Sequence, residues 1–143
     1  MMVRHFRELR VYQRAQEASL RIFEVSKGWP PAERHALTDQ IRRSSRSVCA
    51  DIAEAWRKRR CPNHFVSKLT DADAEAAETQ SWLEMAFRCG YLPEALYREL
   101  DADYEAITKG LVGMMKHRDT WCGPAVLRED FKVYETSPDI DPR

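Results

Sequence analysis

Four stretches of this 143-residue chain place apolar or small side chains at alternating intervals of four and three residues. This spacing constrains the fold more than any other feature, because residues three and four apart share one face of an α-helix. The clearest example lies between residues 37 and 55 and consists of Leu37, Ile41, Ser44, Val48, Ile52 and Ala55. Small residues on and beside this seam would let neighbouring helices approach closely. The pattern predicts an amphipathic helix with a narrow buried face.

The other three stretches repeat the same rhythm and are separated by helix-breaking residues. The first contains Val11, Ala15, Ala18, Ile22, Val25 and Trp29. The third contains Phe65, Leu69, Ala72, Ala76, Thr79, Leu83 and Ala86. The fourth contains Leu100, Tyr104, Ile107, Leu111 and Met114. Pro30-Pro31, Pro62 and the segment from Gly90 to Pro93 mark the turns, so the second helix should run from Pro31 to about Arg59.

Short connections between amphipathic helices favour an all-α fold, an antiparallel up-down-up-down four-helix bundle. We expect the bundle to span residues 1–118 and an irregular C-terminal tail to span 119–143, because the tail has three prolines at 124, 138 and 142 and little periodicity. A chain of this length can form one substantial core. No strand pattern or internal repeat is present.

Composition narrows the class of protein. The chain is 43% hydrophobic and 32% charged, which suits a globular protein. No apolar run is long enough to span a bilayer and the N-terminus lacks a secretory pattern, so we expect a cytoplasmic location without membrane contact. The four cysteines are scattered at 49, 61, 89 and 122, and we expect them to remain thiols.

Charge is balanced overall but unevenly distributed. The chain has 23 Lys and Arg against 23 Asp and Glu, which argues against a uniformly basic nucleic-acid binder. The second helix nevertheless contains seven candidate phosphate-binding residues, Arg42, Arg43, Arg46, Arg57, Lys58, Arg59 and Arg60. They could contact a phosphate backbone. The alternative is a solvated face neutralised by the acidic third helix, with the last four residues also favoured by the helix dipole.

Several aromatic residues lie off the main seams. Trp56, Trp82, Phe87 and Trp121 are candidates for an oligomer interface. Trp56 follows the second helix seam and precedes the last basic run, so it could also stack on a base, although a half-buried interface position is the favoured interpretation.

Catalytic and metal-binding patterns are absent from the sequence, and we expect no enzyme activity, cofactor or metal. No Gly-rich phosphate loop, nucleophile elbow or zinc-protease motif occurs. Cys61 and His64 have the spacing of half a zinc site but lack a second pair. Asp51 and Glu54 lie one helical turn apart, and salt bridges to the basic residues of the same helix are expected to engage them.

The order of these motifs resembles a known family, the small bacterial four-helix bundle proteins encoded by intervening sequences in 23S rRNA genes. The resemblance covers about residues 6–115. Its elements are Leu9-x-x-Tyr12 with Ala15, Trp29-Pro30 with Glu33, Leu37-x-x-Gln40-Ile41-Arg42-Arg43-Ser44 with Ser47-Val48, Asp51-Ile52-Ala53-Glu54-Ala55, and Glu78 to Tyr91-Leu92. This chain differs from the family pattern at Asp51, where Asn is usual, at Ala55, where Gly is usual, and at Ala74-Glu75, where Gly-Ser is common.

The resemblance implies a homopentamer with a central channel. The chain is also similar to accessory proteins of diversity-generating retroelements, which work with a reverse transcriptase and RNA as a basic pentameric ring. If a ring forms, Arg42, Arg43 and Arg46 are the candidates for its basic surface. We therefore expect a non-enzymatic, self-associating scaffold that contacts RNA or a ribonucleoprotein. The alternative is a protein-binding adaptor without nucleic acid, which would use exposed Trp56, Trp82 and Trp121.

Overall fold

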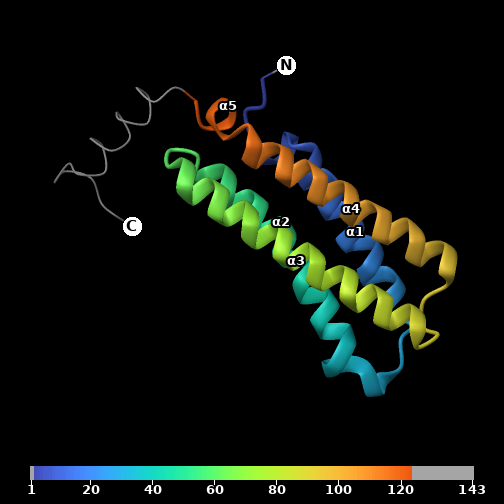
Figure 1. Ribbon diagram of the computed structural model, residues 1–143. Coiled ribbons are helices and arrows are strands. Elements are labelled where there is room, and N and C mark those ends of the chain that lie inside the picture. The colour runs from blue at the N-terminus through green and yellow to red at the C-terminus, as the bar shows by residue number, and fades with distance from the viewer. Residues whose placement is uncertain (1, 124–143) are drawn as a thin grey trace.

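A computed structural model, which describes residues 2–123, consists of helices joined by short turns (Figure 1). Four of these helices are long, and no β-strand occurs within the described residues. The helical elements are η1 (Phe6–Glu8), α1 (Arg10–Ser26), η2 (Pro31–Glu33), η3 (Arg34–Thr38), α2 (Asp39–Arg57), α3 (Pro62–Arg88), α4 (Glu94–Lys116) and α5 (Arg118–Cys122). The all-α prediction is therefore confirmed.

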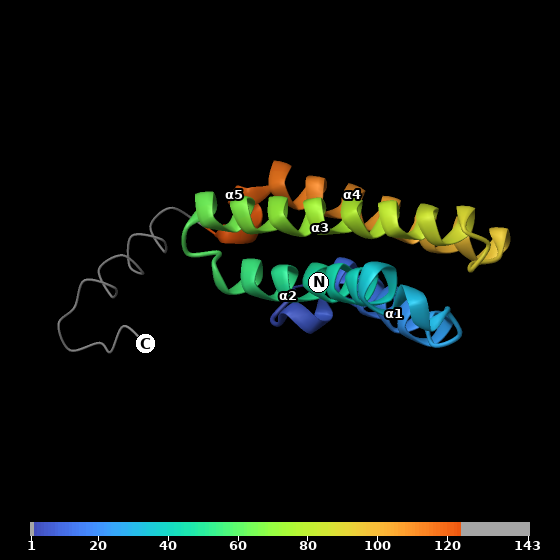
Figure 2. The same cartoon turned by 90° about the horizontal axis from the view of Figure 1, so that it is seen from below.

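The four long helices pack around one core. Figure 2 shows α1 and α2 in one layer and α3 and α4 in the other, and each helix contacts the next in the chain while α1 also contacts α4. The colour gradient in Figure 1 shows that the chain reverses direction between consecutive long helices. As a result, the C-terminal ends of α2 and α4 lie at the same end of the bundle.

The predicted seams form the core. Every seam residue predicted for the third and fourth helices is buried, and so are all those predicted between Leu37 and Ala55. In α1, Val11 and Val25 are only partly buried and pack at the edge of the core. The alternating spacing therefore identified the buried face of each helix correctly.

Small side chains allow close contact between helices, as the sequence predicted for α2. Ser45 accepts a hydrogen bond from Ser19 of α1 at 3.2 Å, and Ser44 accepts one from Thr79 of α3 at 2.8 Å. All four side chains are buried, so these bonds satisfy polar groups inside the core. At a second close approach, a methyl group on Gly110 of α4 would collide with Val11 of α1.

The second predicted helix begins differently from the expectation. Residues 31–38 form a 3₁₀ turn followed by a π-helical turn, and regular α2 starts only at Asp39. Both Leu37 and Thr38 are buried. The wider π turn brings these two consecutive residues toward the core, whereas a regular α-helix turns by about 100° per residue.

The predicted tail begins with a helix. Residues 118–122 form α5, which packs on α3 and α4, so the expectation of irregular structure from residue 119 is wrong for its first residues. Residues 124–143 lie outside the described part of the chain. Figure 1 shows α5, the N-terminus and the α2–α3 turn at the same end of the bundle. Among the described helices, none is both long and apolar enough to cross a membrane.

Candidate nucleic-acid interface

The middle cluster of α2, Arg42, Arg43 and Arg46, contacts other parts of the same chain. Arg42 Nε donates a hydrogen bond to the Oγ atom of buried Ser26 at 2.9 Å. The guanidinium groups of Arg42 and Arg46 lie over the Phe23 ring of α1, with Cζ 4.8 Å and 5.6 Å from its centroid. These cation–π contacts hold two of the three arginines against α1.

Arg43 is paired with the acidic α3 helix. Its Nη2 atom lies 3.2 Å from Glu78 Oε1. Glu75 lies next to this pair, and burial together with the neighbouring Glu78 carboxyl raises its pKa. The shallow groove along the cluster also contains Asp39. Neutralisation by α3 is therefore confirmed for Arg43, and the middle cluster has less free positive charge than its sequence suggests.

The end cluster of α2, Arg57, Lys58, Arg59 and Arg60, has different surroundings. Arg57 and Lys58 are exposed, and neither forms an ion pair within residues 2–123. Their position at the C-terminal end of α2 matches the negative end of its dipole. Lys116, the last residue of α4, and Arg118, the first residue of α5, add further exposed basic residues to this end of the bundle.

Arg59 is held against Trp56. Its Cζ atom lies 3.4 Å from the Trp56 ring centroid, and its Nε atom donates to the Trp56 carbonyl oxygen at 2.8 Å. Burial lowers the pKa of the Arg59 guanidinium. No carboxylate within residues 2–123 pairs with it. Among the described residues, the half-buried Arg59 cation is stabilised by the Trp56 ring, the Trp56 carbonyl group and the nearby Cys122 side chain, and by no carboxylate.

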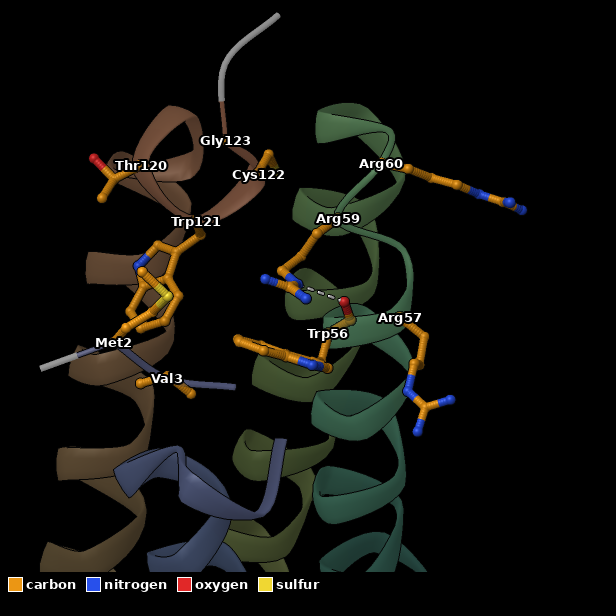
Figure 3. A pocket seen from close by; sticks show the side chains of 10 residues that line it. All are labelled: Met2, Val3, Trp56, Arg57, Arg59, Arg60, Thr120, Trp121, Cys122 and Gly123. Carbon is orange, nitrogen blue, oxygen red and sulfur yellow. Dashed lines mark hydrogen bonds between the residues drawn. The ribbon is translucent and has the colours of Figure 1, made fainter. Parts of the chain in front are cut away.

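A pocket of about 760 Å³ opens beside Arg59 (Figure 3). The Trp56 and Trp121 rings meet edge to face, with centroids 6.3 Å apart and planes at 71°. Figure 3 shows Arg59 and Trp56 extending toward Trp121, whereas Arg57 and Arg60 extend outward. The pocket is lined by Met2, Val3, Trp56, Arg57, Arg59, Arg60, Thr120, Trp121, Cys122 and Gly123.

The four aromatic residues predicted for an oligomer interface do not form one surface. Trp56 is only 4% exposed, so the half-buried position favoured from the sequence and the exposed position that the adaptor alternative requires are both wrong. Trp121 and Arg59 cover its ring. Phe87 stacks on Tyr97 of α4, with centroids 4.7 Å apart. Trp82 is partly buried against the core. Trp121 lines the pocket at the end of the bundle where α3 begins. Trp82 and Phe87 lie in the C-terminal half of α3, away from that end.

The acidic pair on α2 bridges to α3 rather than to its own helix. Lys68 Nζ lies 2.7 Å from Glu54 Oε2 and 3.3 Å from Asp51 Oδ1. The expected partners, Arg46, Arg57 and Lys58, make no such contact within the described residues. The apolar spacing gave no signal for Lys68, because it lies beside the buried seam of α3.

Other reactive side chains are few within residues 2–123. Burial raises the pKa of the Cys49 thiol to about 11, which keeps it protonated at neutral pH. No disulfide is present in the described part of the chain, and no three His, Cys, Asp or Glu side chains there are arranged to hold a metal ion.

The sequence did not predict which residues hold the arginines of α2 in place or which residues complete the pocket. Phe23 and Ser26 belong to α1, and Met2, Val3 and Thr120 complete the pocket from both ends of the described chain. The up-down topology supplies the only signal for the pocket, because it brings the N-terminus and the ends of α2 and α4 together.

Comparison with known proteins identifies similar chains. A family model described as 23S rRNA-intervening sequence protein matches residues 7–113. A solved structure from Bacteroides thetaiotaomicron, a protein of unknown function from the S23 ribosomal protein family, is 31% identical with a TM-score of 0.67. The match covers 74% of this chain and 95% of that chain. None of the curated proteins matches the chain.

Proposed function

Because the chain belongs to the 23S rRNA-intervening sequence protein family, we propose that it is a non-catalytic scaffold that self-associates and contacts RNA. The contact surface is the end cluster of α2 together with the basic residues at the end of α4. The observation that carries this proposal is the exposure of Arg57 and Lys58 without an ion pair in residues 2–123.

Electrostatics supports a local contact despite the zero net charge. Phosphate binding depends on cations that can release counterions from the nucleic acid. Arg43 is already paired with Glu78, and Arg42 is held by Ser26 and Phe23. Arg57 and Lys58 can therefore contribute more to phosphate binding than the middle cluster, which the sequence had suggested for the same role.

A non-catalytic role is supported by the state of the candidate reactive groups. Lys68 bridges the only acid pair singled out from the sequence, Asp51 and Glu54. The raised pKa of the Cys49 thiol keeps it in the protonated, unreactive form at neutral pH. The ion pairs of Asp51 and Glu54 and the burial of Cys49 give these groups structural explanations.

Self-association rests on the family resemblance and on exposed apolar side chains. The resemblance implies a pentamer. Leu20 on α1 is 55% exposed and Met85 on α3 is 49% exposed, and large exposed apolar side chains are common at contacts between proteins. Trp82 is partly buried on the same helix as Met85 and would extend such a contact.

The mass in solution tests the proposal. Light scattering should give a mass near five times 16.7 kDa, and this mass should rise when a structured RNA is added at low salt. Moderate salt should weaken the RNA contact steeply, because the free energy gained by releasing counterions falls as the salt concentration rises. A single-chain mass that RNA leaves unchanged would contradict both parts of the proposal. A salt-insensitive contact with another protein would support the adaptor alternative instead.

A further inference from the structure

The geometry of the end pocket points to a specific ligand: a nucleotide unit, with its base stacked on Trp121 and its phosphate held by Arg59. This inference deepens the proposed RNA contact and rests on it. An unpaired nucleotide of an RNA and a free mononucleotide share this chemistry.

The first observation is the size and composition of the pocket. Its volume of about 760 Å³ lies within the range of small-molecule binding sites. One wall is aromatic and apolar, formed by Trp121, Met2 and Val3, and the other carries the Arg59 guanidinium. A ligand that fits must combine a flat apolar ring with negative charge.

The second observation is the unneutralised charge of Arg59. A half-buried cation is costly unless a counter-ion or several hydrogen bonds compensate for its lost hydration. Within residues 2–123, the Arg59 guanidinium uses only Nε for a hydrogen bond, to the Trp56 carbonyl oxygen. Its two terminal amino groups have no carboxylate partner there. These amino groups can donate to a phosphate in the forked geometry that arginine favours.

The third observation separates the roles of the two tryptophans. Trp56 is 4% exposed and has Arg59 over its ring, so it positions the guanidinium and offers no face to a base. Trp121 is half-buried and lines the pocket. Base–aromatic stacking is the usual way in which proteins bind an unpaired nucleotide. Trp121 is therefore the stacking residue, and Arg57 and Arg60, which point outward in Figure 3, lie where flanking phosphates would pass.

The test uses the full chain and compares adenosine 5′-monophosphate with ribose 5-phosphate, which lacks the base. The mononucleotide should quench tryptophan fluorescence and bind at least about tenfold more tightly than the sugar phosphate, the scale of one stacked base. Equal binding of the two compounds would overturn the inference, because it would reveal an anion site without base recognition.

Variants locate the site. Trp121→Leu keeps an apolar side chain but removes the aromatic face, and it should weaken mononucleotide binding by about tenfold. Trp121→Phe keeps an aromatic face and should largely retain binding. Tyr97→Leu, at a partly buried aromatic residue of α4 outside this pocket, is the matched control and should bind as the wild type does. Arg59→Gln should weaken binding of the mononucleotide more than binding of free adenosine. Unchanged binding by Trp121→Leu would overturn the inference. If the leucine variant does not fold, the test falls to Arg59→Gln, and mononucleotide binding that this variant leaves unchanged would overturn the inference instead.

Two RNA probes distinguish this inference from the broader proposal and identify the source of the ligand. If duplex RNA binds with strong salt dependence but no mononucleotide binds, the pocket inference fails and the RNA scaffold stands. If the mononucleotide binds through Trp121 but no RNA of any form binds, the pocket stands and the scaffold fails. Competition between the mononucleotide and a single-stranded oligonucleotide would identify an RNA nucleotide as the occupant; binding of the mononucleotide without competition would identify a free nucleotide.

Discussion

The two basic clusters of α2 look alike in the sequence but lie in different surroundings. The middle cluster faces α1 on one side and acidic α3 on the other, and contacts from both helices engage all three arginines. The end cluster lies where α2 stops, and there Arg57 and Lys58 reach solvent without a carboxylate partner in residues 2–123. The difference follows from what lies beside each cluster: Phe23 and Ser26 of α1 and Glu78 of α3 contact the middle of α2, whereas no carboxylate of the described residues forms an ion pair with Arg57 or Lys58 at its C-terminal end.

This contrast is the basis for proposing a local anion-binding surface on a chain with no net charge. The ion pair between Arg43 and Glu78 neutralises positive charge in the middle cluster. The acidic residues of α3 therefore reduce the positive potential near Arg57 and Lys58 less than they reduce it near Arg43. Screening limits surface electrostatics to about 8–10 Å at physiological salt. The charge near the contact therefore matters more than the net charge of the chain.

The largest expected difference between the clusters is in RNA affinity. The double variant Arg57→Gln/Lys58→Gln should reduce the slope of log affinity against log salt by about two and weaken binding at low salt by more than about tenfold, because each residue neutralises one phosphate. The matched double variant Arg43→Gln/Arg46→Gln, also made at two exposed arginine positions of α2, should change the slope by less than about one. Binding titrations at several salt concentrations measure both slopes. Equal changes of slope in the two double variants would show that the two clusters contribute equally to RNA binding, contrary to this comparison.

Stability should show the opposite order. Arg42→Ala removes the hydrogen bond to buried Ser26 and the contact with Phe23, so we expect a loss of about 1–2 kcal/mol in the free energy of unfolding. Lys58→Ala should change that free energy by less than about 0.5 kcal/mol, as for an exposed residue without a partner in the described chain. Urea denaturation at one fixed protein concentration measures both, since self-association would otherwise alter the midpoint. A larger loss at Lys58 would contradict the structure.

The sequence predicted what depends on local periodicity. The spacing of residues such as Leu69, Ala72 and Ala76 identified the buried face of α3, because each helix must bury one face whatever its neighbours are. The prolines and Gly90, whose φ is 82°, correctly marked the turns. The π-helical turn at residues 34–38 was missed, because it shifts the register by a fraction of a turn and leaves no gap in the apolar pattern.

The candidate site was less predictable, because its properties depend on contacts between distant residues. The charge of Arg43 is neutralised by Glu78 on another helix, and Trp56 is buried because Trp121 lies against it. The family pattern did reveal one relevant difference: Asp51 and Glu75 replace the usual Asn and Ser. The two carboxylates lie close enough for the charge of Asp51 to help raise the pKa of Glu75.

The smallest expected effect is on the free energy of unfolding, and it comes from the carboxylates beside the middle cluster. Burial and Glu78 raise the pKa of Glu75, and its buried Oε2 atom has no hydrogen-bond partner within the described residues. A raised pKa means that the folded chain binds this proton more tightly than the unfolded chain does. Ionised Glu75 therefore lowers stability as the pH rises from the usual glutamate pKa, about 4.3, through its raised value in the folded chain.

Glu75→Gln should therefore increase the free energy of unfolding at pH 7 by less than about 1 kcal/mol, the scale of surface charge interactions. The gain should shrink as the pH falls from the raised pKa of folded Glu75 towards about 4.3, and it should be largely lost below that, where the unfolded wild-type chain is also protonated at this position. Glu84→Gln, which removes one carboxylate from an exposed position of the same helix, is the control. Urea midpoints at pH 7 and pH 4 measure the difference. A loss of stability at pH 7 would mean that Arg43 needs both Glu75 and Glu78 as counter-ions, and that the middle cluster carries more positive charge than its single ion pair with Glu78 indicates.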